Sequence, residues 1–163
     1  MRDLLLRQFE DRDKEVLWQI IEHVIKGGET YVFDPNSTKE KMLTYWLASD
    51  KKVFVVELES TIVATFTIKA NMPDRGSHVA NASYMVSPDH YGKGIGEFIG
   101  RASLLEAKKL GFKAMQFNYV IKSNEPAVKL WKKIGFKIIG EAPNSFNHPR
   151  LGFTNTYMMY REL

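Results

Sequence analysis

Cysteine is absent from this chain of 163 residues, and long hydrophobic runs are absent with it. Without thiols there is no disulfide framework, no thiolate zinc site and no cysteine nucleophile, and the absence fits a reducing compartment. Near the N-terminus only residues 4–6 form a leucine run, which is too short for the core of a signal peptide. No apolar run approaches the roughly 20 residues that a membrane helix needs. The sequence therefore predicts a soluble, cytoplasmic protein with no membrane partner.

The chain also has only a small surplus of charge of one sign. Lysine and arginine number 23 against 19 aspartates and glutamates, which gives a net charge of +4, and hydrophobic residues make up 44% of the chain. That composition is typical of an ordinary globular protein, and residues 1–163 are enough for one domain that buries a core without metal or disulfide support. A basic surplus of this size suits an anionic small ligand as well as nucleic acid, so charge alone leaves both open.

No internal repeat, low-complexity tract or linker interrupts the chain, and strand and helix patterns alternate along it. Ser37 and Glu40 have the spacing of a capping box, which predicts a helix start. We expect strands at residues 4–9, 52–58, 61–70, 78–86, 114–120, 136–142 and 154–160, and helices at about 16–26, 37–47, 95–110 and 124–136. This order predicts an α/β (α+β) fold in which a central mixed, mostly antiparallel sheet is flanked by helices on both faces.

A glycine-rich segment, HYGKGIGEFIG at residues 90–100, lies between an expected strand and an expected helix. Its first three glycines alternate, so backbone N–H groups and the positive end of the helix converge on one point that can bind phosphate. The P-loop pattern is excluded because Lys93 is followed by Gly94 rather than by serine or threonine. The dinucleotide pattern is excluded because Glu97 or Ile99 stands at its sixth position. A glycine turn that only begins a helix is the simpler alternative.

A second motif, NEPAVKLWKKIGF at residues 124–136, has the pattern of a short amphipathic helix. Its Asn-Glu-Pro start and Gly-Phe end are typical helix boundaries, and its apolar side chains share one face. Together with the glycine loop, this motif resembles the GCN5-related N-acetyltransferase (GNAT) superfamily. That family carries Arg/Gln-x-x-Gly-x-Gly/Ala in the loop and, further along, Asn-x-x-Ala-x-x-Leu-Tyr-x-x-x-Gly-Phe. The order of elements in the N-terminal half fits the family as well.

The resemblance implies an enzyme that uses acetyl-coenzyme A as cosubstrate and no metal. In the family, backbone N–H groups of the loop hold the pyrophosphate of the cofactor, which carries over to Gly92, Lys93, Gly94, Ile95 and Gly96. Tyr91 stands where the family usually has arginine or glutamine. Met85 and Val86 end the strand that, in the family, pairs with the pantetheine arm in the manner of an added strand. Dimers are frequent in the family, so the resemblance allows a homodimer without fixing the oligomeric state.

The resemblance also gives two roles to the 124–136 helix. Asn124 would cap the helix and lie near the thioester, and Trp131 would pack against the cofactor. The family has tyrosine at the position of Trp131, and that hydroxyl often protonates the departing thiolate. Because an indole N–H does not release its proton near neutral pH, this role does not carry over. A thiol has a pKa of about 8.5, so the thiolate can leave with hydrogen-bond help alone, or with a proton from Tyr119 or water.

Asparagine is unusual inside strands, yet two strands expected to be neighbours carry Asn81 and Asn118. Strict alternation puts Asn118 on one face with Val120 and opposite to Phe117. The two amides either satisfy bulges and loop ends or hydrogen-bond a carboxylate or amide of the acceptor. The segments VANASYMV and FNYVIKSNEPAVKLW resemble the GNAT branch that includes the yeast proline-analogue acetyltransferase, which acts on azetidine-2-carboxylate. In that branch, asparagines at the positions of Asn81 and Asn118 contact the small acceptor.

Other residues of the acceptor side are less specific. Tyr31 and Phe33 either line the mouth of the acceptor site or pack in the core. Acetyl transfer needs a neutral amine, so a group must accept its proton, often through water. The candidate bases are Glu29, Asp34, His78 and His148, each of which is more often a loop or solvent residue.

The function that follows is transfer of acetyl to the amine of a small molecule, an amino acid, a cyclic imino acid or a toxic analogue, with Asn124, Asn81 and Asn118 as catalytic candidates. One alternative is acetylation of a protein or peptide amine by the same site. A second alternative is a nucleic-acid or ribosome-binding module that uses a lysine cluster, Lys122, Lys129, Lys132, Lys133 and Lys137. These lysines have the spacing of a solvated helix face, and no RNA-binding aromatic motif accompanies them, so no nucleic-acid partner is expected.

Overall fold

The computed structural model describes residues 3–163, and its strands and helices follow the predicted order. The strands are β1 (Leu4–Gln8), β2 (Lys52–Leu58), β3 (Thr61–Ala70), β4 (Val79–Val86), β5 (Ala114–Ile121), β6 (Lys137–His148) and β7 (Gly152–Glu162). The α-helices are α1 (Lys14–Lys26), α2 (Lys39–Trp46), α3 (Ile95–Lys109) and α4 (Glu125–Lys133), and short 3-10 turns lie at η1 (Asp11–Asp13), η2 (Asp74–Gly76) and η3 (Pro88–His90). The bounds of β2 and β3 are confirmed to the residue, because two β-branched runs flank a tight turn.

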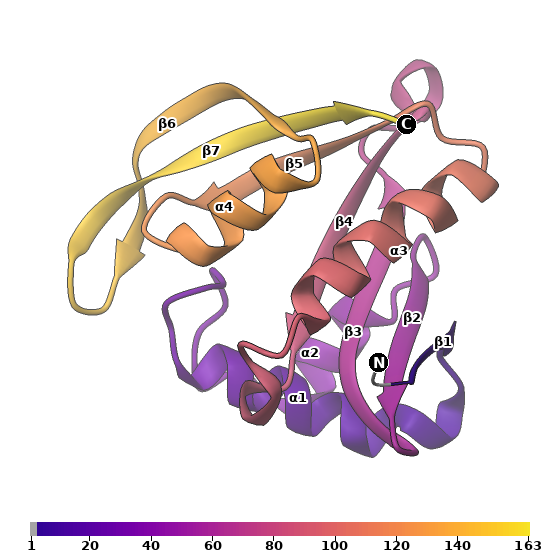
Figure 1. Cartoon of the computed structure of the whole chain (residues 1–163). Helices are drawn as coiled ribbons and strands as arrows, with labels where there is room; N and C mark the ends of the chain where they lie inside the picture. The colour runs from indigo at the N-terminus through magenta and orange to yellow at the C-terminus, as the bar shows by residue number, and fades with distance from the viewer. Residues whose placement is uncertain (1–2) are drawn as a thin grey trace.

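The strands form one mixed sheet in the order β1-β2-β3-β4-β5-β7-β6. All neighbouring pairs are antiparallel except β4 and β5, which confirms the mostly antiparallel sheet. The parallel pair is held only at Val79 with Ala114 and at Ala80 with Met115, although β4 continues to Val86 and β5 to Ile121. The two strands therefore separate into a fork, and β5, β7 and β6 turn away from β4 (Figure 1).

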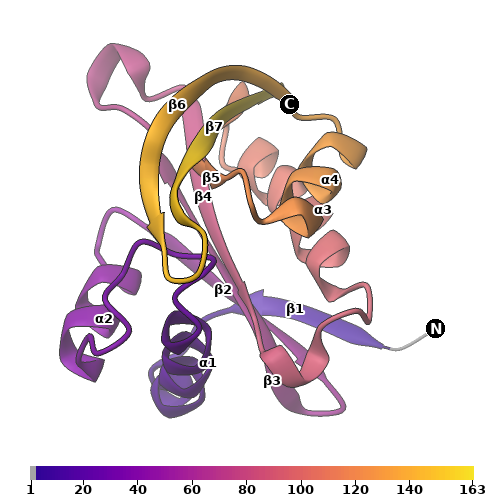
Figure 2. The same cartoon turned by 90° about the vertical axis from the view of Figure 1, so that its left-hand side faces the viewer.

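Helices cover both faces of the sheet, as predicted (Figure 2). One buried cluster joins α3 and α4 to the sheet around Phe66, Phe117 and Trp131. A second, smaller cluster joins α1 and α2 to the opposite face around Trp46 and Met85. Because side chains alternate along β4, this strand contributes to both clusters and lies between them at the fork. In the part of the chain that the structure describes, no helix is long and apolar enough to cross a membrane.

Three local predictions are wrong. The cap of α2 is Thr38, whose side chain accepts a hydrogen bond from the backbone N–H of Lys41, so the capping box does not begin at Ser37. β6 continues well past residue 142, because it is an edge strand that accommodates a proline and an irregular register there. A register shift in β5 between Phe117 and Val120 breaks the alternation, and both side chains enter the same core cluster.

Candidate active site

A cavity of about 960 Å³ runs through the fork between β4 and β5. On the α3 and α4 side, which we call the cofactor end, it is lined by Tyr91, Gly92, Gly94, Ile95, Gly96, Asn124, Pro126, Ala127 and Trp131. On the α1 and α2 side, the acceptor end, it is lined by residues that include Tyr31, Phe33, Tyr45, Lys69, Asn81 and Asn118. Met85 and Val86 also line it, so the fold brings together every predicted cofactor and acceptor residue except Lys93, while the predicted bases lie elsewhere.

The cofactor end is built mainly from backbone. Gly92 and Gly94 have φ angles of 73° and 81°, a region that favours glycine, and a Cβ at either position would meet nothing within 4 Å. Gly94 is the N-cap of α3, and the first helical bond runs from Phe98 N–H to the carbonyl of Gly94. The N–H groups of the first turn therefore have no acceptor within the helix and can bind an anion.

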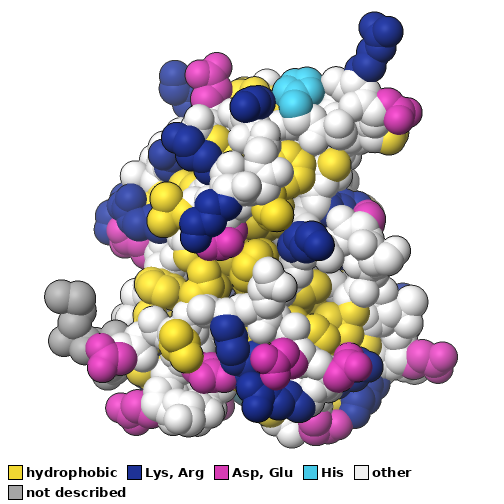
Figure 3. Space-filling view, turned by 90° about the vertical axis from the view of Figure 1, so that its right-hand side faces the viewer, with side chains coloured by type: hydrophobic (Ala, Val, Ile, Leu, Met, Phe, Trp, Pro, Cys, Tyr) yellow, Lys and Arg dark blue, Asp and Glu magenta, His cyan; other side chains and the backbone are white. Residues whose placement is uncertain are grey.

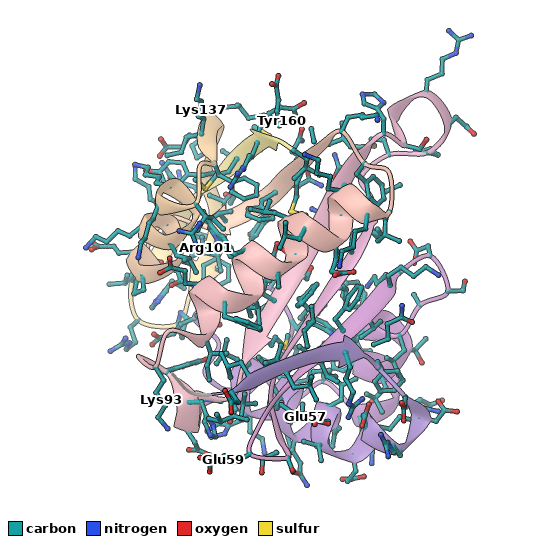
Figure 4. All side chains as sticks on the ribbon, turned by 45° about the vertical axis from the view of Figure 1, so that its right-hand side comes forward. Glu57, Glu59, Lys93, Arg101, Lys137 and Tyr160 are labelled. Carbon is teal, nitrogen blue, oxygen red and sulfur yellow. The ribbon has the colours of Figure 1, made fainter. Side chains whose placement is uncertain are left out.

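Two charged residues of this loop region turn away from the cavity. The Lys93 ammonium donates to the carbonyl of Asp89 at 2.8 Å, so only its backbone remains at the loop (Figure 4). Glu97, in the first turn of α3, accepts from Lys133 at 2.6 Å and from Arg101 at 3.0 Å. These hydrogen bonds, with Lys133 first, lower the pKa of Glu97. The carboxylate is thus paired with two cations, which limits its repulsion of a bound phosphate.

The free edge of β4 carries the backbone groups of the fork. Ser87 N–H donates to Val63 on β3, so Val86 N–H, one residue earlier, points toward the fork. At Tyr84 the edge is occupied, because the Tyr31 hydroxyl donates to the Tyr84 carbonyl at 2.7 Å and accepts from the Tyr84 N–H at 3.0 Å. Burial raises the pKa of Tyr31, which keeps the hydroxyl neutral. The α1–α2 loop is therefore attached to the same strand edge that a pantetheine arm would use.

Helix α4 places two predicted residues at the fork. The Asn124 side chain caps the helix by accepting from Ala127 N–H at 3.4 Å, a long hydrogen bond. Trp131 is buried, with ring centroids 4.7 Å from Tyr84 and 4.8 Å from Phe117. Its indole fills the core beside the fork and also lines the cavity.

The asparagines of the acceptor end belong to an amide network. Asn81 donates to the Gln116 carbonyl at 2.9 Å and so bridges β4 and β5 at the start of the fork. Asn118 lies in the β5 bulge, donates to Asn71 at 2.7 Å and accepts from the Gln116 side chain at 3.0 Å. The amides thus satisfy a bulge and also line the cavity, and a hydrogen bond from them to an acceptor stays a prediction.

Aromatic rings form a wall at the same end of the cavity. Tyr31 stacks on Phe33 with centroids 5.8 Å apart, and Phe33 meets the edge of Tyr45 at 4.9 Å. Tyr31 also contacts Trp46, whose indole donates to Thr65 on β3. Tyr31 and Phe33 therefore line the cavity and pack against the second core cluster at once.

The structure adds residues that sequence reasoning missed. Lys69 at the end of β3, His90 in η3 and Tyr45 in α2 all line the cavity. His90 Nδ1 is buried and has no hydrogen-bond partner in residues 3–163. Only the strand register, which pairs Lys69 with Asn81, reveals that these two residues lie on the same face of the sheet.

The candidate bases lie elsewhere. Glu29 forms an ion pair with Arg150 at 2.7 Å and faces His148 at 4.0 Å, while His148 Nδ1 accepts from two backbone N–H groups. This cluster holds the β6–β7 hairpin against the α1–α2 loop. Asp34 accepts from the backbone of Asn36 in a turn, and His78 is exposed. None of the four predicted bases is among the residues that line the cavity.

The fold and the loop correspond to one known family. The family model described as "Acetyltransferase (GNAT) family" matches residues 7–136, so the chain belongs to the GNAT family of N-acetyltransferases. It is 29% identical over 161 residues to N-acetyltransferase aca1 of Schizosaccharomyces pombe, a match that covers 87% of this chain and 76% of that protein.

Solved structures agree with this assignment. A GCN5-related N-acetyltransferase from Kribbella flavida is 34% identical and superimposes with a TM-score of 0.93 over 98% of both chains. A GNAT superfamily phosphinothricin acetyltransferase from Sinorhizobium meliloti, in complex with acetyl-coenzyme A, shares the fold at 18% identity, with a TM-score of 0.85 over 98% of this chain and 88% of that chain.

Proposed function

We propose that this enzyme transfers the acetyl group of acetyl-coenzyme A to the amine of a small molecule, an amino acid, a cyclic imino acid or a toxic analogue of one. The observation that carries the proposal is a single cavity that crosses the sheet at the fork. One end offers backbone N–H groups for phosphates, and the other offers amides and aromatic rings for a small acceptor. The resemblance of the asparagine-bearing strands to the proline-analogue branch supports the amino or imino acid.

The cosubstrate fits the cofactor end by its chemistry. Its pyrophosphate would accept hydrogen bonds from the N–H groups of Gly92 to Gly96, and its pantetheine arm would lie along the free edge of β4 beside Met85 and Val86. The neighbour from S. meliloti, which was solved in complex with acetyl-coenzyme A, supports the choice of this cosubstrate. Asn124 and Trp131 would then flank the thioester.

Direct attack accounts for the chemistry. The neutral amine forms a bond to the thioester carbon, the carbonyl oxygen becomes negative, and Val86 N–H stabilises it by a hydrogen bond. Collapse breaks the C–S bond and releases the thiolate of coenzyme A. The proton of the amine passes to water or to His90, which lines the cavity, since no carboxylate lines it in the described residues. The thiolate takes a proton from water or from Tyr119, which lines the cavity.

The two alternatives have weaker support. Three members of the lysine cluster are engaged with acids, because Lys122 pairs with Glu141, Lys129 with Glu125 and Lys133 with Glu97. On the face shown in Figure 3, basic and acidic side chains are interspersed rather than gathered in a basic stripe. This distribution disfavours a nucleic-acid surface. For a peptide acceptor, the aromatic wall of the acceptor end would have to admit a main chain.

Release of free thiol from acetyl-coenzyme A tests the proposal. The panel contains the common L-amino acids, cyclic imino acids such as L-proline and azetidine-2-carboxylate, simple amines and a lysine-containing peptide. We expect turnover with one or more amino or imino acids and none with the peptide. Turnover with the peptide alone would contradict the choice of acceptor. Silence with every amine, despite binding of coenzyme A, would contradict the catalytic proposal.

A further inference from the structure

Among the described residues, the cavity lining contains a single charged side chain, and that side chain is basic. Lys69 is the one lysine, arginine, aspartate or glutamate among the described residues that line the cavity. It lies at the end of β3, and its register partner on β4 is Asn81. Directly opposed residues of an antiparallel pair project to the same face with Cβ atoms about 5 Å apart. Lys69 and Asn81 therefore start from adjacent positions on one face of the sheet, and both line the acceptor end of the cavity.

The ion pair with Asp50 does not hold the Lys69 ammonium firmly. Its contact with Asp50 is 3.5 Å long, and the two side chains are 36% and 60% exposed. Such exposed pairs contribute little, so the ammonium can turn toward a ligand at small cost.

A second ammonium adds to the positive potential. Lys51 lies with its Nζ 3.4 Å from the centroid of the Tyr45 ring. Its pKa is lowered to about 8, first by burial and then by the positive charge of Lys69. Lys51 does not line the cavity, but its ammonium contacts Tyr45, which does, so its charge adds to the positive potential near the acceptor end.

We infer that Lys69 forms a carboxylate subsite, so that the enzyme selects amine acceptors that carry a carboxylate group. The inference rests on the proposed function and deepens it by naming the residue that reads the acceptor. The carboxylate binds the Lys69 ammonium beside the Asn81 amide, and the amine is directed toward the fork. The same lining disfavours polyamines and basic peptides, because it offers them no carboxylate.

The test compares L-proline with pyrrolidine, which is the same ring without the carboxylate. Both are titrated by calorimetry into the coenzyme A-loaded protein, and both are assayed by thiol release. The variants are Lys69→Met, Lys69→Arg and the control Lys52→Met, a lysine on β2 that does not line the cavity. Loss of a charge-assisted hydrogen bond corresponds to about a 10-fold to 100-fold change.

We expect the wild-type protein and Lys52→Met to prefer L-proline. Lys69→Met should lose about 10-fold to 100-fold in affinity and in kcat/KM for L-proline, with pyrrolidine unchanged, and Lys69→Arg should retain most of the preference. Equal losses for both ligands, or no loss for either, would overturn the subsite. Binding preference without turnover would support the subsite and contradict the proposed function. Turnover of L-proline and pyrrolidine without preference for the carboxylate would support the acetyl transfer and contradict the subsite.

Discussion

The two ends of the cavity are built by different means. The cofactor end uses backbone from one continuous stretch, the loop of residues 91–96, with the start of α4 beside it. The acceptor end uses side chains from separate segments, Tyr31 from the α1–α2 loop, Lys69 from β3, Asn81 from β4 and Asn118 from β5. Backbone recognition depends on local conformation, whereas side-chain recognition depends on how distant segments meet. Substitutions should therefore affect the two ends in different ways.

The largest effect is expected at the cofactor end. Gly94→Ala should weaken binding of coenzyme A by about 100-fold, because a Cβ there displaces one or two charge-assisted hydrogen bonds of about 1.5–3 kcal/mol each. Gly111→Ala is the matched control, since Gly111 also has a positive φ and open space around a Cβ, but does not line the cavity. Both variants should lose about 1–2 kcal/mol of stability. Calorimetric titration measures the affinity and thermal unfolding measures the stability. Equal coenzyme A affinities of the two variants would contradict a role of the Gly94 backbone in cofactor binding.

Asn124 tests whether a cap can also act on the cofactor. Asn124→Ala should lower turnover by about 10-fold, as expected for one lost hydrogen bond in the reacting complex, and stability by at most about 1 kcal/mol. Thr38→Ala removes the cap of α2 outside the cavity and should cost similar stability with unchanged turnover. If Asn124→Ala behaves like Thr38→Ala in the thiol-release assay, Asn124 is a cap alone.

Tyr31 connects the two ends. Tyr31→Phe removes the hydroxyl that occupies the backbone of Tyr84, so we expect about 5-fold tighter binding of coenzyme A. The unliganded protein should lose about 1 kcal/mol of stability, because a buried N–H and carbonyl lose their partner. Tyr45→Phe, at another tyrosine of the wall, is the control for both measurements. Weaker cofactor binding by Tyr31→Phe would mean that the hydroxyl assists the cofactor.

Trp131 should matter more for packing than for proton transfer. Trp131→Phe is expected to keep turnover within about 3-fold of the wild-type value, because an indole N–H does not supply the proton. Stability should fall by about 1–2 kcal/mol as the buried ring becomes smaller. A collapse of kcat with unchanged cofactor affinity would assign Trp131 a direct role in catalysis.

The smallest effect concerns Lys51, whose ammonium lies over the ring of Tyr45 at the acceptor end. Its pKa is lowered from 10.5 to about 8, so between these values the unfolded chain binds more protons than the folded protein. Stability should therefore rise with pH across this window, by less than about 1 kcal/mol after allowance for solvent screening. Lys51→Met should show a smaller rise in denaturant titrations at pH 8 and pH 10.5. Identical pH dependence in the two proteins would contradict the lowered pKa.

Most of the fold could be predicted because its signals are local. β-branched runs and their glycine or turn boundaries define elements such as β2 and β3. The errors arise where tertiary context decides. Thr38 rather than Ser37 caps α2, and the bulge in β5 carries Val120 into the core beside Phe117. A bulge has no sequence signature here, because the alternation on either side of it looks regular.

The site likewise has a part that local sequence predicts and a part that depends on tertiary context. The glycine loop could be predicted because its conformation follows from its own sequence, and only the side chain of Lys93 lies elsewhere. Lys69 could not be predicted, because its place beside Asn81 depends on the register of two strands. The bond from Tyr31 to Tyr84 spans 53 residues and depends on how the α1–α2 loop meets β4. Acceptor recognition is therefore the part of this enzyme that its sequence encodes least directly.

Amide hydrogen exchange with and without coenzyme A tests the central claim most directly, that the cosubstrate lies in the fork between β4 and β5. We expect slower exchange at Val86 and at residues 92–96 when coenzyme A is bound, with exchange on β1 and on the β6–β7 hairpin unchanged. Protection confined to other parts of the sheet, or coenzyme A binding that leaves Val86 and the glycine loop unprotected, would contradict it.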